Sequence, residues 1–146
     1  MGYNRGMKYI TDIHALNMEC DLGTMGDWHR SGIDWSHPRT LESESTPWGD
    51  WGIEVGSSRP VPLNPGPHNI ANHVRALCDM VLMGRFRAAE GMGDEFLDGD
   101  SYDSEVFSHI AMLAGYENWD AIDRFMAREY GRRWFRFLDD RGLRRC

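Results

Sequence analysis

The chain has 146 residues, a length typical of one domain, and its 41% hydrophobic, 27% charged and 12% aromatic residues are the composition of a folded protein. The net charge of −7 argues against general nucleic-acid binding, and no apolar stretch approaches the roughly 20 residues that span a bilayer. Cys20, Cys78 and Cys146 are an odd number at wide spacing, which indicates reduced thiols rather than a disulfide framework. Since no signal peptide is evident either, we expect a cytoplasmic protein without a membrane anchor.

The first half of the chain predicts little regular structure. Alternating residues in 7–16 indicate a short strand followed by a turn, and residues 51–55 are a second strand candidate. Between them, residues 17–50 are rich in Gly, Ser, Asp, Thr and Trp, and we expect turns and short strands packed by aromatic rings. Residues 56–67 contain four prolines and predict a loop.

From residue 68 onward the pattern becomes helical. A first helix has Asn69 as its N-cap and stops at Gly84. Its apolar face consists of Ile70, Val74, Leu77, Cys78 and Val81. A short helix around 85–90 follows.

Two more helical segments follow the acidic stretch. One covers 106–114, with Asp103 or Ser104 as its cap and Gly115 as its end. Apolar residues from Trp119 to Leu138 then keep near-helical spacing, which predicts one long helix that begins after Asn118 and that Gly131 can bend.

These elements predict an α+β fold. We expect a single domain over 1–146, in which a small, irregular, β-containing half (1–67) packs on three to four helices of the second half (68–146).

Histidines and aspartates of the first half suggest a polar site. The candidates for catalysis are His14, Asp27, His29 and His73. Imidazole and carboxylate groups can act as acids, bases or metal ligands, but no His-x-x-x-His spacing is present, so we predict neither a metal nor a cofactor. The alternative is that each histidine is a half-buried structural residue.

The triplet Gly-Asp-Trp occurs twice, at 26–28 and at 49–51. Gly-Asp is typical of a turn, and a Trp that follows can anchor the loop in the core. Alternatively, the rings line a binding surface. The candidates for that surface are Trp28, Trp35, Trp48, Asp50, Trp51, Asn72 and Arg75.

Two charged segments allow further interpretations. Residues Asp94–Glu105 have the length of an EF-hand loop and Gly99 at its sixth position, but Phe96 stands where an oxygen ligand belongs, so we expect a solvated acidic loop. Arginines alternate with aromatic residues between Arg128 and Arg145, which suits nucleic-acid contact. The interpretation that we prefer is a core helix whose arginines meet the acidic segment.

The sequence also resembles a family of small bacterial proteins. The strings that carry the resemblance are Tyr9-Ile10-Thr11-Asp12-Ile13-His14-Ala15-Leu16-Asn17, Gly26-Asp27-Trp28-His29, Ala71-Asn72-His73-Val74-Arg75-Ala76 and Ile122-Asp123-Arg124-Phe125-Met126. Proteins of this family look like companions of nucleotidyltransferase-type toxins in defence or mobile loci. The resemblance therefore implies an antitoxin or accessory role, and it assigns no catalytic residue.

Three hypotheses about function follow. The first is a protein-binding module, an antitoxin or inhibitor whose acidic segment and exposed Trp residues engage a basic toxin or effector. The second is a small enzyme or ligand-binding protein that uses the His/Asp/Trp pocket, although the common phosphate-loop and nucleophile motifs are absent. The third is a nucleic-acid-binding regulator that uses the Arg128–Arg145 helix.

Overall fold

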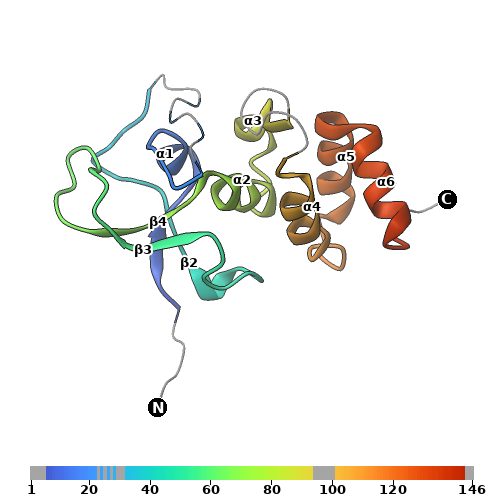
Figure 1. Ribbon diagram of the computed structural model, residues 1–146, viewed down its shortest axis with the longest axis horizontal. Helices are drawn as coiled ribbons and strands as arrows, with labels where there is room; N and C mark the ends of the chain where they lie inside the picture. The colour runs from blue at the N-terminus through green and yellow to red at the C-terminus, as the bar shows by residue number, and fades with distance from the viewer. Residues whose placement is uncertain are drawn as a thin grey trace, which may run out of the picture. The chain divides into compact units, whose positions relative to one another are not determined.

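The computed structural model in Figure 1 describes residues 6–22, 24, 26, 28, 32–93 and 101–143. They form an α+β fold, as predicted. The chain forms two compact units, Met1–Asp79 and Met80–Cys146, and the division falls inside a helix rather than in the proline-rich loop.

A mixed four-stranded sheet is the framework of the first unit. Its strands are β1 (Lys8–Ile10), β2 (Thr40–Glu42), β3 (Ile53–Ser57) and β4 (His68–Ala71), in the order β2-β1-β4-β3. β1 and β4 are parallel, and the two outer pairs are antiparallel. The predicted strand within 7–16 is thus confirmed as β1. The strand predicted at 51–55 is β3 but lies two residues later, so Gly56 and Ser57, predicted as the start of a loop, belong to it. Two short helical turns, α1 (Asp12–Leu16) and η1 (Ser43–Ser45), follow β1 and β2.

β4 corrects one sequence prediction. Asn69 and Ile70 were expected at the start of a helix, but they belong to this strand, and α2 (His73–Leu82) begins after Asn72. The Oδ1 of Asn72 accepts the backbone N–H of Arg75 at 2.9 Å, as an N-cap side chain does. A short apolar run fits a strand and a helix equally well. Here the segment is a strand because Ile70 pairs with both β1 and β3.

Strand alternation divides the side chains of the sheet between its two faces. Ile10 is the partner of Ile70, so these two buried residues share one face. Tyr9 projects from the opposite face, and its hydroxyl reaches Asp79 on α2. α2 therefore packs against the face of the sheet from which Tyr9 projects.

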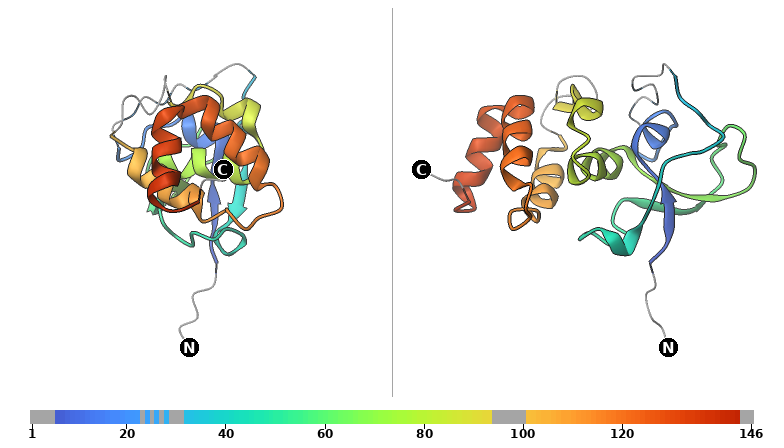
Figure 2. Two further views of the ribbon diagram at one scale, coloured as in Figure 1. Left: turned by 90° about the vertical axis from the view of Figure 1, so that its right-hand side faces the viewer. Right: turned by 180° about the vertical axis from the view of Figure 1, so that it is seen from behind.

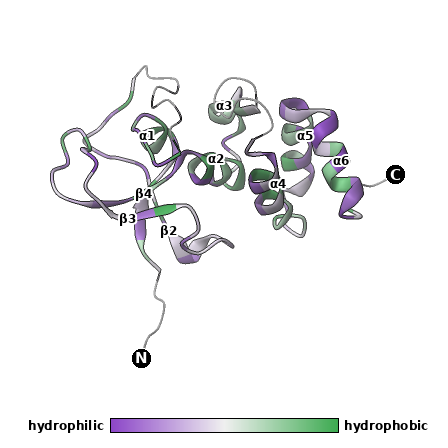
Figure 3. Cartoon of the chain, viewed as in Figure 1, coloured by the Kyte–Doolittle hydropathy of each residue, from purple (hydrophilic) through white to green (hydrophobic). Residues whose placement is uncertain are grey.

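Helices form the described part of the second unit. They are α3 (Phe86–Ala89), α4 (Asp103–Ala111), α5 (Trp119–Tyr130) and α6 (Arg132–Asp140). Figure 2 shows α5 and α6 side by side, and Figure 3 shows hydrophilic and hydrophobic residues alternating around both, as in amphipathic helices. The ring of Phe107 packs edge-on against Tyr130 at 4.8 Å and Trp134 at 5.3 Å, which joins α4 to both.

The long helix predicted over 119–138 is wrong, because two helices replace it. Gly131 has φ 56° and ψ −128°, a conformation that ends α5. The rings of Trp119 and Trp134 lie 6.1 Å apart. A continuous helix rises about 1.5 Å per residue and would separate these positions by about 22 Å. α6 therefore folds back along α5.

Other helix boundaries differ less. α2 does stop at Gly84, where φ is +73° and the N–H of Arg85 bonds the Met80 carbonyl at 2.8 Å. The predicted short helix at 85–90 is confirmed as α3. The predicted cap at Asp103 or Ser104 is wrong, because α4 begins at Asp103 and Tyr102 precedes it without a capping side chain.

Asp103 instead forms a salt bridge with Arg133, at 2.7 Å between Oδ2 and Nε. One arginine of the C-terminal segment thus meets the acidic stretch, as we expected. Residues 94–100 of the EF-hand-like loop lie outside the described residues. Within the described ranges, every helix is too short or too polar to cross a lipid bilayer.

Candidate functional site

A buried arginine is the centre of the first unit. Arg75 and Asp79, one turn apart on α2, are fully buried, and the Nε of Arg75 donates to Oδ1 of Asp79 at 2.9 Å. Nη1 donates to the carbonyls of Gly49 (2.9 Å) and Trp51. Nη2 donates to the Tyr9 hydroxyl at 3.0 Å and to Thr46 Oγ1 at 2.9 Å. A guanidinium has five N–H donors, so all of them have acceptors here.

Asp79 receives a matching set of donors. The Tyr9 hydroxyl donates to its Oδ2 at 2.6 Å and the Thr11 hydroxyl at 2.8 Å. Burial raises the pKa of Asp79, while Arg75 and the hydroxyls act in the opposite direction. Burial and the adjacent Asp79 carboxylate also raise the pKa of Tyr9 far above its usual value, which keeps the phenol protonated as a donor. The cluster is a satisfied structural network.

This network fixes the second Gly-Asp-Trp triplet. Arg75 binds the carbonyls on both sides of Asp50, and the Gly52 carbonyl accepts the N–H of Asn72 at 2.7 Å. Gly52 has φ +72°, and a Cβ there would lie 2.7 Å from Cβ of Arg75, so only glycine fits. We call residues 49–52 the Asp50–Trp51 tip.

The side chains of the Asp50–Trp51 tip divide between surface and core. Asp50 is exposed and Trp51 is half-exposed, whereas Trp48 is buried and packs edge-on against Trp51 at 6.1 Å. The guanidinium of Arg75 lies under both rings, 5.5 Å from the Trp48 centroid and 5.9 Å from that of Trp51. Trp48, Asp50, Trp51, Asn72 and Arg75 are thus brought together, with Asp50 and Trp51 facing outward.

The other predicted Trp residues lie elsewhere in the unit. Trp28 of the first triplet is buried, and its carbonyl accepts the side-chain amide of Asn17 at 2.5 Å. Trp35 is half-exposed and packs edge-on against the imidazole of His14 at 5.0 Å. Two members of the predicted pocket, Asp27 and His29, lie outside the described residues.

His14 has a structural environment. Its Nδ1 accepts the backbone N–H of Arg39 at 3.0 Å, so its Nε2 carries the proton and donates to the Asp34 carbonyl at 2.9 Å. Both ring nitrogens are therefore used to hold the loop before β2.

His73 is fully buried and has a different set of partners. Its Nε2 donates to the Met18 carbonyl at 2.6 Å, and its Nδ1 bonds the hydroxyl of Thr24. The same hydroxyl lies 3.6 Å from the sulfur of Cys20. His73 thus belongs to a group with Cys20 and Thr24, and no short spacing in the sequence joins these three residues.

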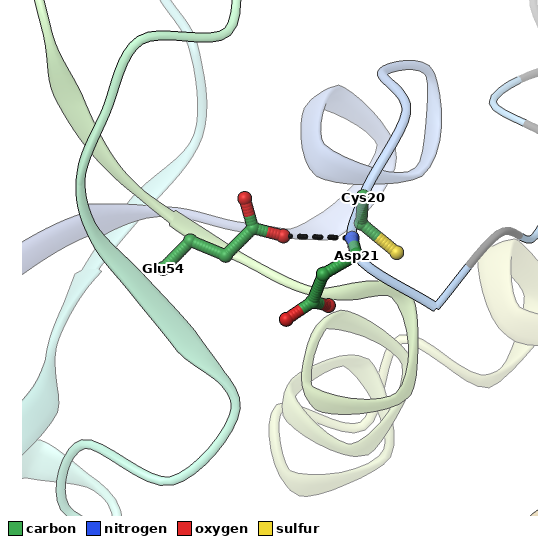
Figure 4. A group of neighbouring side chains, drawn as sticks. All are labelled: Cys20, Asp21 and Glu54. Carbon is green, nitrogen blue, oxygen red and sulfur yellow. Dashed lines mark hydrogen bonds between the residues drawn. The ribbon is translucent and has the colours of Figure 1, made fainter.

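A possible metal-binding group lies beside Cys20. The sulfur and the carboxylates of Asp21 and Glu54 have ligand atoms within 4.8 Å of one another, and Figure 4 shows how these side chains approach from β3 and from the segment after α1. Both oxygens of Glu54 are already used, however. One accepts the N–H of Asp21 at 3.0 Å, and the other pairs with Arg59 at 2.8 Å. This guanidinium supplies the positive charge that a metal ion would bring.

A groove of about 570 Å³ opens on the sheet of the first unit. All four strands contribute to its walls, together with the loops at 37–38 and 64–67. Lys8, the only lysine of the chain, lines it with His37 and His68. Its size and mixed lining suit a small anionic ligand or an acidic side chain.

Comparison with protein-family models, with curated proteins and with solved structures finds no match for this chain.

Proposed function

We propose that this chain is a cytoplasmic protein-binding module, an antitoxin or inhibitor-like partner in a defence or mobile-element system, and that its Asp50–Trp51 tip binds a basic segment of the partner. The observation that carries the proposal is the rigid presentation of an exposed carboxylate and a half-exposed indole by the buried Arg75. A surface that is ordered before binding loses little conformational entropy when a partner docks.

The chemistry of the tip suits arginine or lysine. A carboxylate pairs with a guanidinium or ammonium, and the face of an indole attracts the same cation. Trp is also among the residues that most often dominate the energy of protein interfaces. Asp50 and Trp51 together therefore offer two kinds of contact to one cationic side chain.

The charge of the preceding segment favours the same kind of partner. Glu42 and Glu44, from β2 and η1, are exposed and come from the same stretch of chain as the tip. The whole chain carries a net charge of −7. Such a field speeds association with a basic protein and disfavours nucleic acid.

Affinity capture from native cells tests the proposal. The tagged chain is compared with a variant that carries Asp50→Asn and Trp51→Ala, and co-purified proteins are quantified by mass spectrometry. We expect a basic protein to be captured by the unchanged chain. Loss of about 2 kcal/mol at an interface centre corresponds to about a 30-fold weaker capture by the variant. Capture should also weaken as salt is raised.

The chain offers a matched control. Tyr116 and Glu117 are likewise an adjacent exposed aromatic and acidic pair, in the second unit, and Tyr116→Ala with Glu117→Gln should leave capture unchanged. Trp51→Phe, with circular dichroism of every variant, separates binding from folding. Equal capture by the tip variant and the control variant, or capture of nucleic acid alone, would contradict the proposal.

A further inference from the structure

The thiol of Cys20 lies in an environment that the proposed function does not use. It sits in the segment after α1, and only 7% of the residue is exposed. Thr24 and His73, the first residue of α2, complete the group. The residue is buried, so we expect only a small reagent to react with its sulfur.

The hydrogen bonds of this group have a defined direction. The Met18 carbonyl can only accept, so Nε2 of His73 carries a proton, and Nδ1 is an acceptor in the tautomer that has its one proton on Nε2. Thr24 therefore donates its hydroxyl proton to Nδ1. The oxygen of Thr24 is then free to accept from the Cys20 thiol, 3.6 Å away. The three groups form a path that leads a proton from sulfur to imidazole.

The backbone also favours a thiolate. The N–H groups of Leu22 and His73 hydrogen-bond the sulfur, and the second of these belongs to the positive end of the α2 dipole. Burial alone would raise the pKa of Cys20, but the His73 side chain and these two N–H groups outweigh it, and the pKa lies below its usual value.

Charged neighbours act on a thiolate in both directions. Asp21 and Glu54 disfavour a further negative charge nearby, and Arg59, which pairs with Glu54 at 2.8 Å, offsets part of their effect. Arg59 also interacts electrostatically with Cys20 itself. The Cys20 thiol and the His73 imidazole are thus arranged as a nucleophile with an adjacent base.

We propose that Cys20, Thr24 and His73 form a thiol-modification site at which Cys20 reacts with a small hydroperoxide. The thiol proton passes through Thr24 to Nδ1 of His73. The sulfur then attacks the terminal oxygen of the peroxide and the O–O bond breaks, so that sulfur is oxidised by two electrons and the peroxide is reduced. The leaving alkoxide or hydroxide takes the proton from the imidazolium. The products are the sulfenic acid of Cys20 and an alcohol or water.

The test uses the full chain with hydrogen peroxide, and trapping of sulfenic acid by dimedone is measured per cysteine by mass spectrometry. We expect Cys20 to be trapped at pH 7 at least tenfold faster than Cys78, which is fully buried in α2. A parallel alkylation with iodoacetamide gives the pH profile of Cys20. Because a lowered pKa leaves more thiolate at neutral pH, its rate should persist below the pH at which an ordinary thiol slows.

Thr24 provides the decisive variants. Thr24→Val keeps the shape and removes the hydroxyl that passes the thiol proton to His73, so the trapping rate should fall about tenfold. Thr24→Ser should restore the rate, which a purely structural role of the methyl group would not do. The proposal is overturned if Cys20 reacts no faster than Cys78, or if Thr24→Val is folded and keeps the unchanged rate. A Thr24→Val chain that does not fold leaves the decision to the comparison of Cys20 with Cys78.

Discussion

Two arginine–carboxylate pairs of the first unit have similar geometry and different surroundings. Arg75 and Asp79 have side chains with 0% exposure, whereas Arg59 and Glu54 are 31% and 17% exposed. Breaking a buried pair leaves an uncompensated charge in a medium of low dielectric constant. Water screens a partly exposed pair and solvates whichever charge remains.

Replacement of each arginine by methionine should therefore have unequal effects. We expect Arg75→Met to lower the free energy of unfolding by about 3–5 kcal/mol, because Asp79 stays buried without its cation. Arg59→Met, the matched control, should lower it by less than about 1 kcal/mol. Urea unfolding at pH 7 measures both.

A double variant tests whether the unpaired charge of Asp79 causes the loss of stability. Arg75→Met with Asp79→Leu removes both charges, so part of the lost stability should return. If Arg75→Met costs no more than Arg59→Met, the buried network does not organise the unit, and the support for a rigid Asp50–Trp51 tip disappears.

The sequence could supply only part of this network. Arg75 and Asp79 are one helical turn apart, and such a pair can be read from spacing. Arg75 was predicted as a binding residue, but its other partners are far away in the chain, Tyr9 by 66 residues and Thr46 by 29. The same limit hid Cys20, whose link to His73 exists only after the sheet and α2 have packed.

Among the helices and strands, periodicity predicted those whose conformation depends mainly on their own residues. The apolar stripe of α2 is local, and so is the glycine that ends it. β4 depends on partners in β1 and β3, so its four residues, His68–Ala71, show no pattern of their own. The break between α5 and α6 depends on one glycine and on the fit of Trp134 against α5, where its Nε1 donates to Asp123 at 2.7 Å.

Gly131 should therefore be a sensitive position. Its φ of 56° with ψ of −128° is costly for any residue with a Cβ, although a Cβ would meet no atom within 4 Å. We expect Gly131→Ala to lower the free energy of unfolding by about 1–3 kcal/mol through backbone strain alone. Gly115→Ala is the control, because this glycine has open space and no positive φ. Equal urea midpoints for the two variants would contradict this account of the helix break.

The boundary between the two compact units does not coincide with the change in composition along the chain. Composition changes at residue 68, yet the compact units are Met1–Asp79 and Met80–Cys146, and α2 spans the division. A helix is cooperative, since each added residue extends hydrogen bonding that is already nucleated. We therefore expect α2 to link the stability of the two units through its own backbone.

Hydrogen exchange of the α2 amides can measure this link. In the native chain, amides on the two sides of the division, such as those of Leu77 and Val81, should exchange with the same opening free energy. Gly131→Ala weakens only the second unit directly, so a shared helix predicts that it lowers protection at both positions alike. Gly115→Ala should lower neither. If Gly131→Ala lowers protection at Val81 and leaves Leu77 unchanged, the helix opens in two parts, and the two units are energetically independent although one helix runs through both.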